Sequence, residues 1–234
     1  MNDILQITSL SKNYSKTQAL KDINLAIPKG KIIGLLGPNG SGKTTLIKTI
    51  TGLITDYQGS IAIKGESPGP KANNHISYLP DKNHIPSWLT VKQAIAFFAD
   101  FYRDFDSSHA EEMLTTMSIP LDKKIKTLSR GMQEKVQLSL VMSRRVSLYV
   151  LDEPIGAVDP ASREFIIDTI IKNFPEDSSI FLSTHIIADI ESILDVAIFL
   201  REGEIVMHED VDKIREEKAT SLDGLFREVF RNVY

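Results

Sequence analysis

The spacing of apolar residues predicts strands and turns over the first quarter of the chain. Short β-branched and apolar runs lie at residues 4–10, 24–37 and 59–65. Gly and Pro separate these runs, a pattern that is typical of strands. Between the second and third runs, Leu46, Ile50 and Leu53 have a spacing that suits a helix packed on a sheet. We therefore expect a strand, a glycine-rich loop and a helix in this order.

The middle of the chain has a different pattern, which is mostly helical. Helices are predicted at residues 91–105, 109–118 and 132–145. The remainder alternates between element types, with strands at 147–154 and 179–184, helices at 163–174 and 187–194, and a hairpin at 196–209. Strands that alternate with helices predict a parallel α/β core, which is interrupted here by a helical insert.

The C-terminal segment is expected to form a short helical appendage. Phe226 and Phe230 are four residues apart, so they lie on one face of a helix. We expect this face to pack on the body of the protein rather than to form an interface with a partner.

Composition and charge exclude several classes of function. The 234 residues include no cysteine, which excludes thiol catalysis, thiolate zinc sites and disulfide scaffolds. A formal net charge of −4 argues against broad electrostatic binding of nucleic acid. The sequence has no apolar run near the ~20 residues of a membrane span, and its first residues lack a signal-peptide pattern. We expect a soluble protein, or one that reaches a membrane only through a partner.

A phosphate-binding loop is predicted directly after an apolar strand. The eight residues of the loop are Gly37, Pro38, Asn39, Gly40, Ser41, Gly42, Lys43 and Thr44. They fit the pattern G-x-x-x-x-G-K-[ST], in which backbone N–H groups turn inward around phosphate oxygens. The helix that follows adds about half an elementary positive charge at its N-terminus. Lys43 is expected to reach the β- and γ-phosphates of a nucleotide, and the Thr44 hydroxyl to bind Mg²⁺.

Two acidic residues end the apolar strand near residue 150. Because the carboxyl ends of parallel strands meet at one edge of a sheet, Asp152 is expected beside the phosphate loop. Asp152 would hold Mg²⁺, and Glu153 would orient or deprotonate the attacking water. An ordinary acidic turn after a buried strand is the alternative interpretation.

Together with six further residues, these motifs resemble the ABC-type ATPases, which are the nucleotide-binding subunits of ATP-binding-cassette transporters. The resemblance covers nearly the whole chain, and the motifs occur in the family's order. The matching positions are Tyr14 for the aromatic that stacks on adenine, Thr45 beside the phosphate loop, Ser129 and Gly131 in LSRGM for the signature LSGGQ, Asp159 for the loop that crosses to a second subunit, and His185 for the histidine that contacts the γ-phosphate.

Three of these positions also have ordinary structural explanations. Ser129 can be a simple helix N-cap, although a hydroxyl and bare N–H groups at a helix N-terminus also suit phosphate. Tyr14 can be a packing residue. His185 can be a polar strand end, although it is able to donate a hydrogen bond to a phosphate oxygen.

The sequence departs from the family at two places. Asp81 stands where the family usually has a glutamine near the Mg²⁺ and the attacking water. An aspartate cannot donate an amide hydrogen bond but can approach Mg²⁺ through water, so Asp81 is a candidate metal-site residue; an ordinary turn aspartate is the alternative. The signature has Arg130 and Met132 for its usual glycine and glutamine, which resembles exporter-type cassettes.

Aromatic residues are concentrated in the helical insert, which matches the part of the family that meets the membrane subunit. They are Trp88, Phe97, Phe98, Phe101 and Tyr102. Aromatic residues at helical spacing are more often core than docking surface, so the residues alone favour a core; the resemblance favours a partner groove.

The resemblance implies an α/β fold of the P-loop NTPase class, with a mostly parallel central sheet, N-terminal antiparallel strands and an inserted helical subdomain. It implies a single domain with an ATPase core at 1–83 and 146–212, a helical subdomain at 84–145 and an appendage at 213–234. ATP and Mg²⁺ are the implied cofactors. Each cassette would pair with a second one, as a homodimer or heterodimer, and would drive integral membrane subunits at the cytoplasmic face of the membrane.

Three other functions compete with this interpretation. A soluble ABC-type ATPase that acts on a cytosolic assembly stays open. A small-molecule kinase would share the phosphate loop, but it explains neither the signature nor Asp159 and His185. A binding module without hydrolysis is disfavoured by the intact Glu153.

Overall fold

The computed structural model describes residues 3–156, 159–218 and 220–231. Its strands are β1 (Asp3–Tyr14), β2 (Thr17–Pro28), β3 (Ile32–Leu36), β4 (Gln58–Ile63), β5 (Ile76–Leu79), β6 (Leu148–Asp152), β7 (Ser179–Thr184), β8 (Val196–Arg201) and β9 (Glu204–Asp210). Its α-helices are α1 (Lys43–Ile50), α2 (Val91–Phe101), α3 (Ser107–Thr116), α4 (Arg130–Met142), α5 (Pro160–Lys172), α6 (Ile187–Ile190), α7 (Val211–Lys218) and α8 (Leu222–Val229). Short 3₁₀ helices lie at Ala72–His75, Ile125–Thr127 and Glu191–Ile193.

The strands form two sheets. The larger has the order β5-β6-β7-β3-β8-β9 and is parallel from β5 to β8, with β9 antiparallel at its edge. The smaller is antiparallel, with the order β2-β1-β4. The expected mostly parallel sheet with antiparallel N-terminal strands is therefore confirmed.

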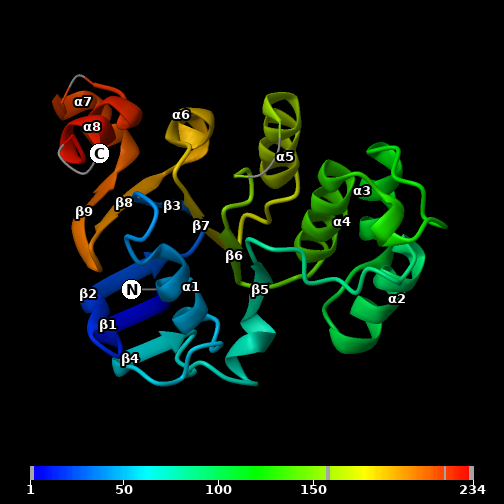
Figure 1. The fold of residues 1–234 in the computed structure, drawn as a ribbon, viewed down its shortest axis with the longest axis horizontal. Coiled ribbons are helices and arrows are strands. Elements are labelled where there is room, and N and C mark those ends of the chain that lie inside the picture. The colour runs from blue at the N-terminus through cyan, green and yellow to red at the C-terminus, as the bar shows by residue number, and fades with distance from the viewer. Residues whose placement is uncertain (1–2, 157–158, 219, 232–234) are drawn as a thin grey trace.

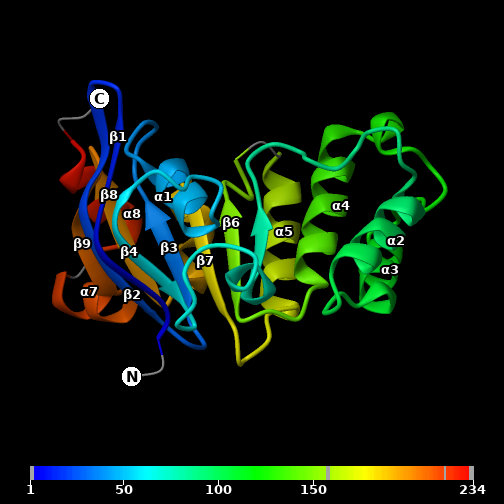
Figure 2. The ribbon, with the colours of Figure 1, turned by 90° about the horizontal axis from the view of Figure 1, so that it is seen from below.

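Helices α2 to α4 form a separate group at one end of the molecule, as Figures 1 and 2 show in green, and the antiparallel sheet and the C-terminal helices lie at the other end. The group has its own apolar core, whose buried members run from Ile85 to Leu140. The Thr90 hydroxyl starts α2 by accepting the Gln93 N–H, and the Gln93 side chain accepts the Thr90 N–H in return. This capping box fixes where the helical part begins.

The P-loop helix α1 lies between the two sheets. Leu46 and Ile50 are buried in one cluster with side chains of both sheets, as the spacing predicts. The expectation for Leu53 is wrong, since its side chain is 63% exposed. Helix α1 ends at Ile50, and Gly52, with φ 75°, turns the chain before Leu53 is reached.

The apolar run at 24–37 is not one strand but the end of β2 and the whole of β3, which belong to different sheets. Pro28 ends β2, and Gly30 takes φ 75° in the turn that follows. Because proline cannot donate to a ladder and glycine adopts a positive φ without strain, the chain leaves one sheet here and enters the other.

The C-terminal helices pack on the body of the protein, as expected. Phe226 and Phe230 are buried, and their ring centroids lie 5.4 Å and 5.8 Å from that of Phe199 on β8. Edge-to-face and tilted aromatic contacts of this kind stabilise a core by more than the burial of their apolar area alone.

The aromatic residues of the helical insert divide between core and surface. Phe98 is buried, whereas Trp88 and Phe101 are more than 60% exposed and Phe97 is 42% exposed. The preference of the residues alone for a core therefore holds for Phe98 but not for these three.

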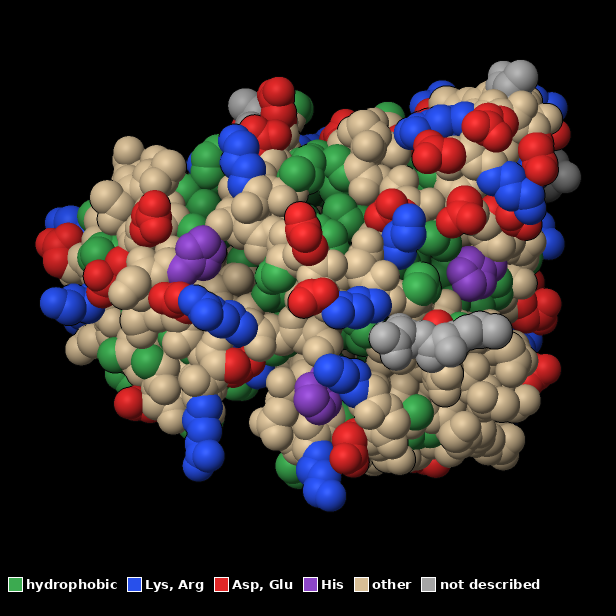
Figure 3. Space-filling model, turned by 180° about the vertical axis from the view of Figure 1, so that it is seen from behind, with side chains coloured by type: hydrophobic (Ala, Val, Ile, Leu, Met, Phe, Trp, Pro, Cys, Tyr) green, Lys and Arg blue, Asp and Glu red, His purple; other side chains and the backbone are tan. Residues whose placement is uncertain are grey.

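The rest of the surface is mixed in charge. On the face drawn in Figure 3, basic and acidic side chains are interspersed rather than gathered by sign. Within the described ranges, we find no helix with the length and apolar character of a membrane span.

Candidate nucleotide site

The phosphate loop connects the carboxyl end of β3 to the first residue of α1. Gly40 and Gly42 adopt φ values of 82° and 111°, which residues with a Cβ rarely take. A Cβ on Gly42 would also lie 2.7 Å from the carbonyl oxygen of Ala19. The loop therefore requires glycine here, and it leads directly into the N-terminus of α1.

Lys43 carries the positive charge of the loop. Its Nζ donates hydrogen bonds to the carbonyl oxygens of Gly37 (2.7 Å) and Pro38 (3.2 Å), and it lies 3.5 Å from Oε1 of Glu153. Burial lowers the pKa of Lys43, while the nearby Glu153 carboxylate opposes this shift. A buried ammonium next to open N–H groups is an arrangement suited to a phosphate anion.

Asp152 ends β6 and is buried. Its Oδ1 accepts hydrogen bonds from the hydroxyls of Ser183 (2.6 Å) and Thr44 (3.4 Å). Its Oδ2 is buried without a hydrogen-bond partner among the described residues. Burial raises the pKa of Asp152, because the ionised carboxylate loses its hydration. A buried carboxylate oxygen without a donor, close to a threonine hydroxyl, fits Mg²⁺, which takes few protein oxygens and completes its shell with phosphates and water.

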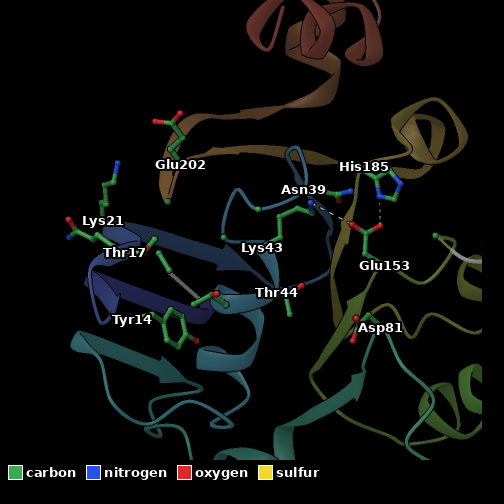
Figure 4. A pocket seen from close by; sticks show the side chains of 17 residues that line it. Tyr14, Thr17, Lys21, Asn39, Lys43, Thr44, Asp81, Glu153, His185 and Glu202 are labelled. Carbon is green, nitrogen blue, oxygen red and sulfur yellow. Dashed lines mark hydrogen bonds and ion pairs between the residues drawn. The ribbon is translucent and has the colours of Figure 1, made fainter. Parts of the chain in front are cut away.

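Glu153 lies between Lys43 and His185, as Figure 4 shows. Its Oε2 is 2.9 Å from Nδ1 of His185, which follows β7. The Glu153 backbone has φ 52°, in the left-handed region that non-glycine residues rarely adopt. Its N–H is held by the carbonyl and hydroxyl oxygens of Ser183. Such a strained residue, fixed by its neighbours, is typical of functional sites.

Most of the candidate residues line one cavity of about 640 Å³. Asp152, which accepts a hydrogen bond from the lining residue Thr44, is not among its described lining residues, and neither are Gly37, Pro38 and Ser41. Among its lining residues are Tyr14, Asn39, Gly40, Gly42, Lys43, Thr44, Thr45, Asp81, Glu153 and His185. Tyr14 forms the wall at the end of β1, at a distance along the cavity from the carboxylates (Figure 4). Phosphate-binding, acidic and aromatic candidates that are far apart in the sequence thus line the same cavity.

Ser129, Gly131 and Asp159 are not among the described residues that line this cavity. Ser129 is the N-cap of α4, and its hydroxyl accepts the N–H of Met132 at 3.3 Å. Asp159 is exposed, and its carbonyl accepts the N–H of Arg163 at the start of α5. The chain therefore presents two surfaces, the cavity and the signature segment.

Ser183 is a site residue that the sequence analysis missed. Its hydroxyl donates to the Asp152 carboxylate and accepts from the backbone N–H of Glu153, so that one side chain holds both a carboxylate and the backbone of the residue that follows it. A signal for it exists, because β7 ends in two hydroxyl residues directly before His185. The neighbouring Thr184 hydroxyl accepts the N–H of Ile186 and starts the turn toward α6.

The fold and the cavity define a P-loop nucleoside triphosphatase. Residues 20–156 match the family described as "ABC transporter". The chain is 34% identical to the ABC transporter ATP-binding protein YtrB of Bacillus subtilis (strain 168), over 92% of this chain and 74% of that protein. It is 29% identical to the SkfA peptide export ATP-binding protein SkfE of the same organism, over 92% of each.

The structure is similar to a solved structure of the ATP-binding subunit of an ABC transporter, with a TM-score of 0.85 and 27% identity. That similarity covers 97% of this chain and 99% of the other. The chain therefore belongs to the ABC transporter family. It is an ATP-binding and ATP-hydrolysing subunit of a transporter.

Proposed function

We propose that Lys43, Glu153 and His185 carry out ATP hydrolysis in this chain. The observation that carries this proposal is their contact network: Glu153 lies 3.5 Å from Lys43 and 2.9 Å from His185, inside the cavity. Lys43 holds the β- and γ-phosphates and neutralises charge that develops on the transferred group. Glu153 accepts a proton from the attacking water, and His185 donates a hydrogen bond to the γ-phosphate.

The metal-binding residues proposed here are Asp152 and Thr44, with Asp81 approaching through water. Asp152 supplies the buried oxygen that lacks a donor, and Asp81 lines the same cavity. When bound, Mg²⁺ would neutralise the phosphate oxygens and orient the triphosphate. Ser183 keeps the Asp152 carboxylate aimed at the phosphate loop through its 2.6 Å hydrogen bond.

The rest of the nucleotide is held by two further groups of contacts. The N–H groups of Gly37, of residues 39–42 and of the start of α1, including Thr45, surround the phosphates, and Pro38, which has no N–H, shapes the turn of the loop. Tyr14 stacks on the adenine ring, which is supported by its place on the cavity wall and by its 46% exposure.

Ser129, Gly131 and Asp159 act on the nucleotide of a second cassette. This proposal is supported by their position outside the cavity of their own chain and by the N-terminus of α4 behind Ser129. ATP would then join two cassettes, each providing the phosphate loop of one site and the signature of the other.

The dimer is tested by Ser129→Arg in a Glu153→Gln background. The bulky cation is expected to abolish the ATP-dependent dimer, as seen by light scattering, because it fills the space that the partner's phosphates need. Binding of a fluorescent ATP analogue to the monomer should stay within about two-fold, since Ser129 does not touch its own cavity. The Glu153→Gln chain alone is the matched control. An unchanged dimer would contradict the proposed role of the signature.

We also propose the division that the sequence predicts, into a core at 1–83 and 146–212, a helical part at 84–145 and an appendage at 213–234. The separate apolar core of the helical part supports this division. The boundary is not free of contacts, because Leu138, Val141 and Met142 of α4 are buried in the apolar cluster of the central sheet.

The helical part docks on an integral membrane subunit at the cytoplasmic face of the membrane. Two observations support this surface. Leu53, Tyr78, His84, Phe98 and Tyr102 line a second cavity of about 510 Å³. In the same helical part, Trp88, Phe97 and Phe101 expose aromatic side chains, which are enriched at protein interfaces. Export is the proposed direction, which is supported by the similarity to a peptide export protein.

A further inference from the structure

Lys12 on β1 is a buried lysine next to the proposed adenine site. Its side chain is 6% exposed, although lysine is almost never buried without a partner. Its Nζ lies 3.1 Å from Oδ2 of Asp56 and 4.9 Å from the centroid of the Tyr14 ring. The ammonium is therefore held between a carboxylate and an aromatic face, which is the geometry of a cation–π contact.

The ammonium approaches the Tyr14 ring from outside the nucleotide cavity. Tyr14 lines that cavity, whereas Lys12 is not among its described lining residues. Tyr14 therefore contacts the ammonium and also borders the cavity. Tyr14 also ends its strand, next to a turn in which Ser15 has φ 49°, so the strand alone does little to fix the ring.

Asp56 links this contact to the phosphate-binding part of the chain. It lies between the end of α1 and the start of β4, 44 residues from Lys12 in the sequence. One buried ammonium therefore ties the aromatic wall of the cavity to the segment that follows the P-loop helix.

We infer that Lys12 is a positioning residue for the nucleotide base. By contacting the rear face of Tyr14, its ammonium holds the ring in the orientation in which adenine stacks on the front face. The ring is then ordered before ATP arrives, so binding does not have to order it. The inference rests on the proposed stacking of Tyr14 on adenine, and it concerns affinity for the base rather than the chemical step.

The test is Lys12→Met, which keeps a long apolar stem and removes the ammonium. We expect the KM for ATP to rise roughly five-fold with kcat unchanged, which corresponds to a modest cation–π contact. Inhibition by inorganic tripolyphosphate, which has no base, should be unchanged. The matched control is Lys29→Met, because Lys29 also pairs with an exposed aspartate, Asp177, at 2.6 Å, but away from the cavity. Its kinetics should equal those of the parent.

A double-mutant cycle that combines Lys12→Met with Tyr14→Ala tests the positioning role of Lys12 separately from the proposed stacking of Tyr14 on adenine. Tyr14→Ala should raise the KM for ATP roughly ten-fold, and Lys12→Met should add nothing in that background. If Tyr14→Ala leaves the KM unchanged, the proposed stacking is wrong. Suppose instead that Tyr14→Ala raises the KM for ATP. The positioning role is then overturned if Lys12→Met leaves the KM unchanged, if its effect is fully additive with that of Tyr14→Ala, or if it weakens inhibition by tripolyphosphate as much as it weakens ATP binding.

Asp56→Asn provides a second variant that keeps Lys12 in place. It removes the anion that anchors the ammonium, so a rise of roughly two-fold in the KM for ATP is expected. Thermal unfolding of each variant shows whether it is folded. If Lys12→Met does not fold, an Asp56→Asn chain with the parent KM would overturn the inference.

Discussion

Replacing Glu153 by glutamine is expected to lower Mg²⁺-dependent ATP hydrolysis by about 10²–10⁴-fold, the usual contribution of a general base. The amide cannot accept the proton of the attacking water. It keeps the shape of the side chain that lies between Lys43 and His185, so ATP affinity should change by less than about two-fold. Phosphate release and binding of a fluorescent ATP analogue measure the two effects separately.

The same variant is expected to accumulate an ATP-bound dimer, because hydrolysis no longer separates the two cassettes. Light scattering should show twice the monomer mass with ATP and the monomer mass with ADP. Glu164→Gln, at an exposed position on α5, is the matched control and should hydrolyse ATP like the parent. A Glu153→Gln chain with the parent rate would show that the proton acceptor is another group.

Replacing Asp152 by asparagine is expected to have opposite effects on activity and stability. Hydrolysis should fall by about 10²-fold or more, because the buried oxygen that would bind Mg²⁺ becomes an amide nitrogen. In the absence of Mg²⁺ and nucleotide, the free energy of unfolding at neutral pH should rise by about 1 kcal/mol, because a buried, incompletely paired carboxylate is neutralised.

The stability effect has a defined pH dependence. Burial raises the pKa of Asp152 in the folded chain above its ordinary value of 3.8. Below pH 3.8 the carboxyl group is protonated in both states, so the difference between variant and parent is absent there. The higher free energy of unfolding of the Asp152→Asn variant develops as the pH rises from 3.8, and it reaches its full value above the pKa of Asp152 in the folded chain. Urea unfolding at several pH values measures it.

Asp122→Asn, at an exposed position in the helical part, is the control for both readouts. Its stability should match that of the parent within about 0.5 kcal/mol. If Asp152→Asn instead kept the activity of the parent, the assignment of the metal site would be wrong.

The motifs that could be predicted from the sequence are those whose chemistry is local. The phosphate loop is one contiguous segment, and its glycines are required by the backbone itself, as the φ of 111° at Gly42 illustrates. Asp152 and His185 could be placed together because both follow strands of a parallel sheet, whose carboxyl ends share an edge. In each case a short-range rule determines the position of the residue.

Contacts between distant segments could not be predicted in this way. The hydroxyl of Ser183 reaches Asp152, and Lys12 reaches Asp56, only because the strands pair in a register that no single segment specifies. Pro28 and Gly30 mark where residues 24–37 divide, but they do not specify which sheet each part joins. The helical spacing of Phe101 could not decide between core and surface, because it predicts which residues share a face and not whether another element covers that face.

The most direct test of the central claim, an ATPase subunit that drives a membrane partner, is to purify the tagged chain from native membranes in mild detergent. We predict that one integral membrane protein is recovered in near-equal amount. The Phe101→Asp variant should no longer recover this membrane protein. The Ile171→Asp variant, changed at an exposed apolar position on α5, should still recover it. Recovery of the parent chain with cytosolic proteins alone would contradict the account.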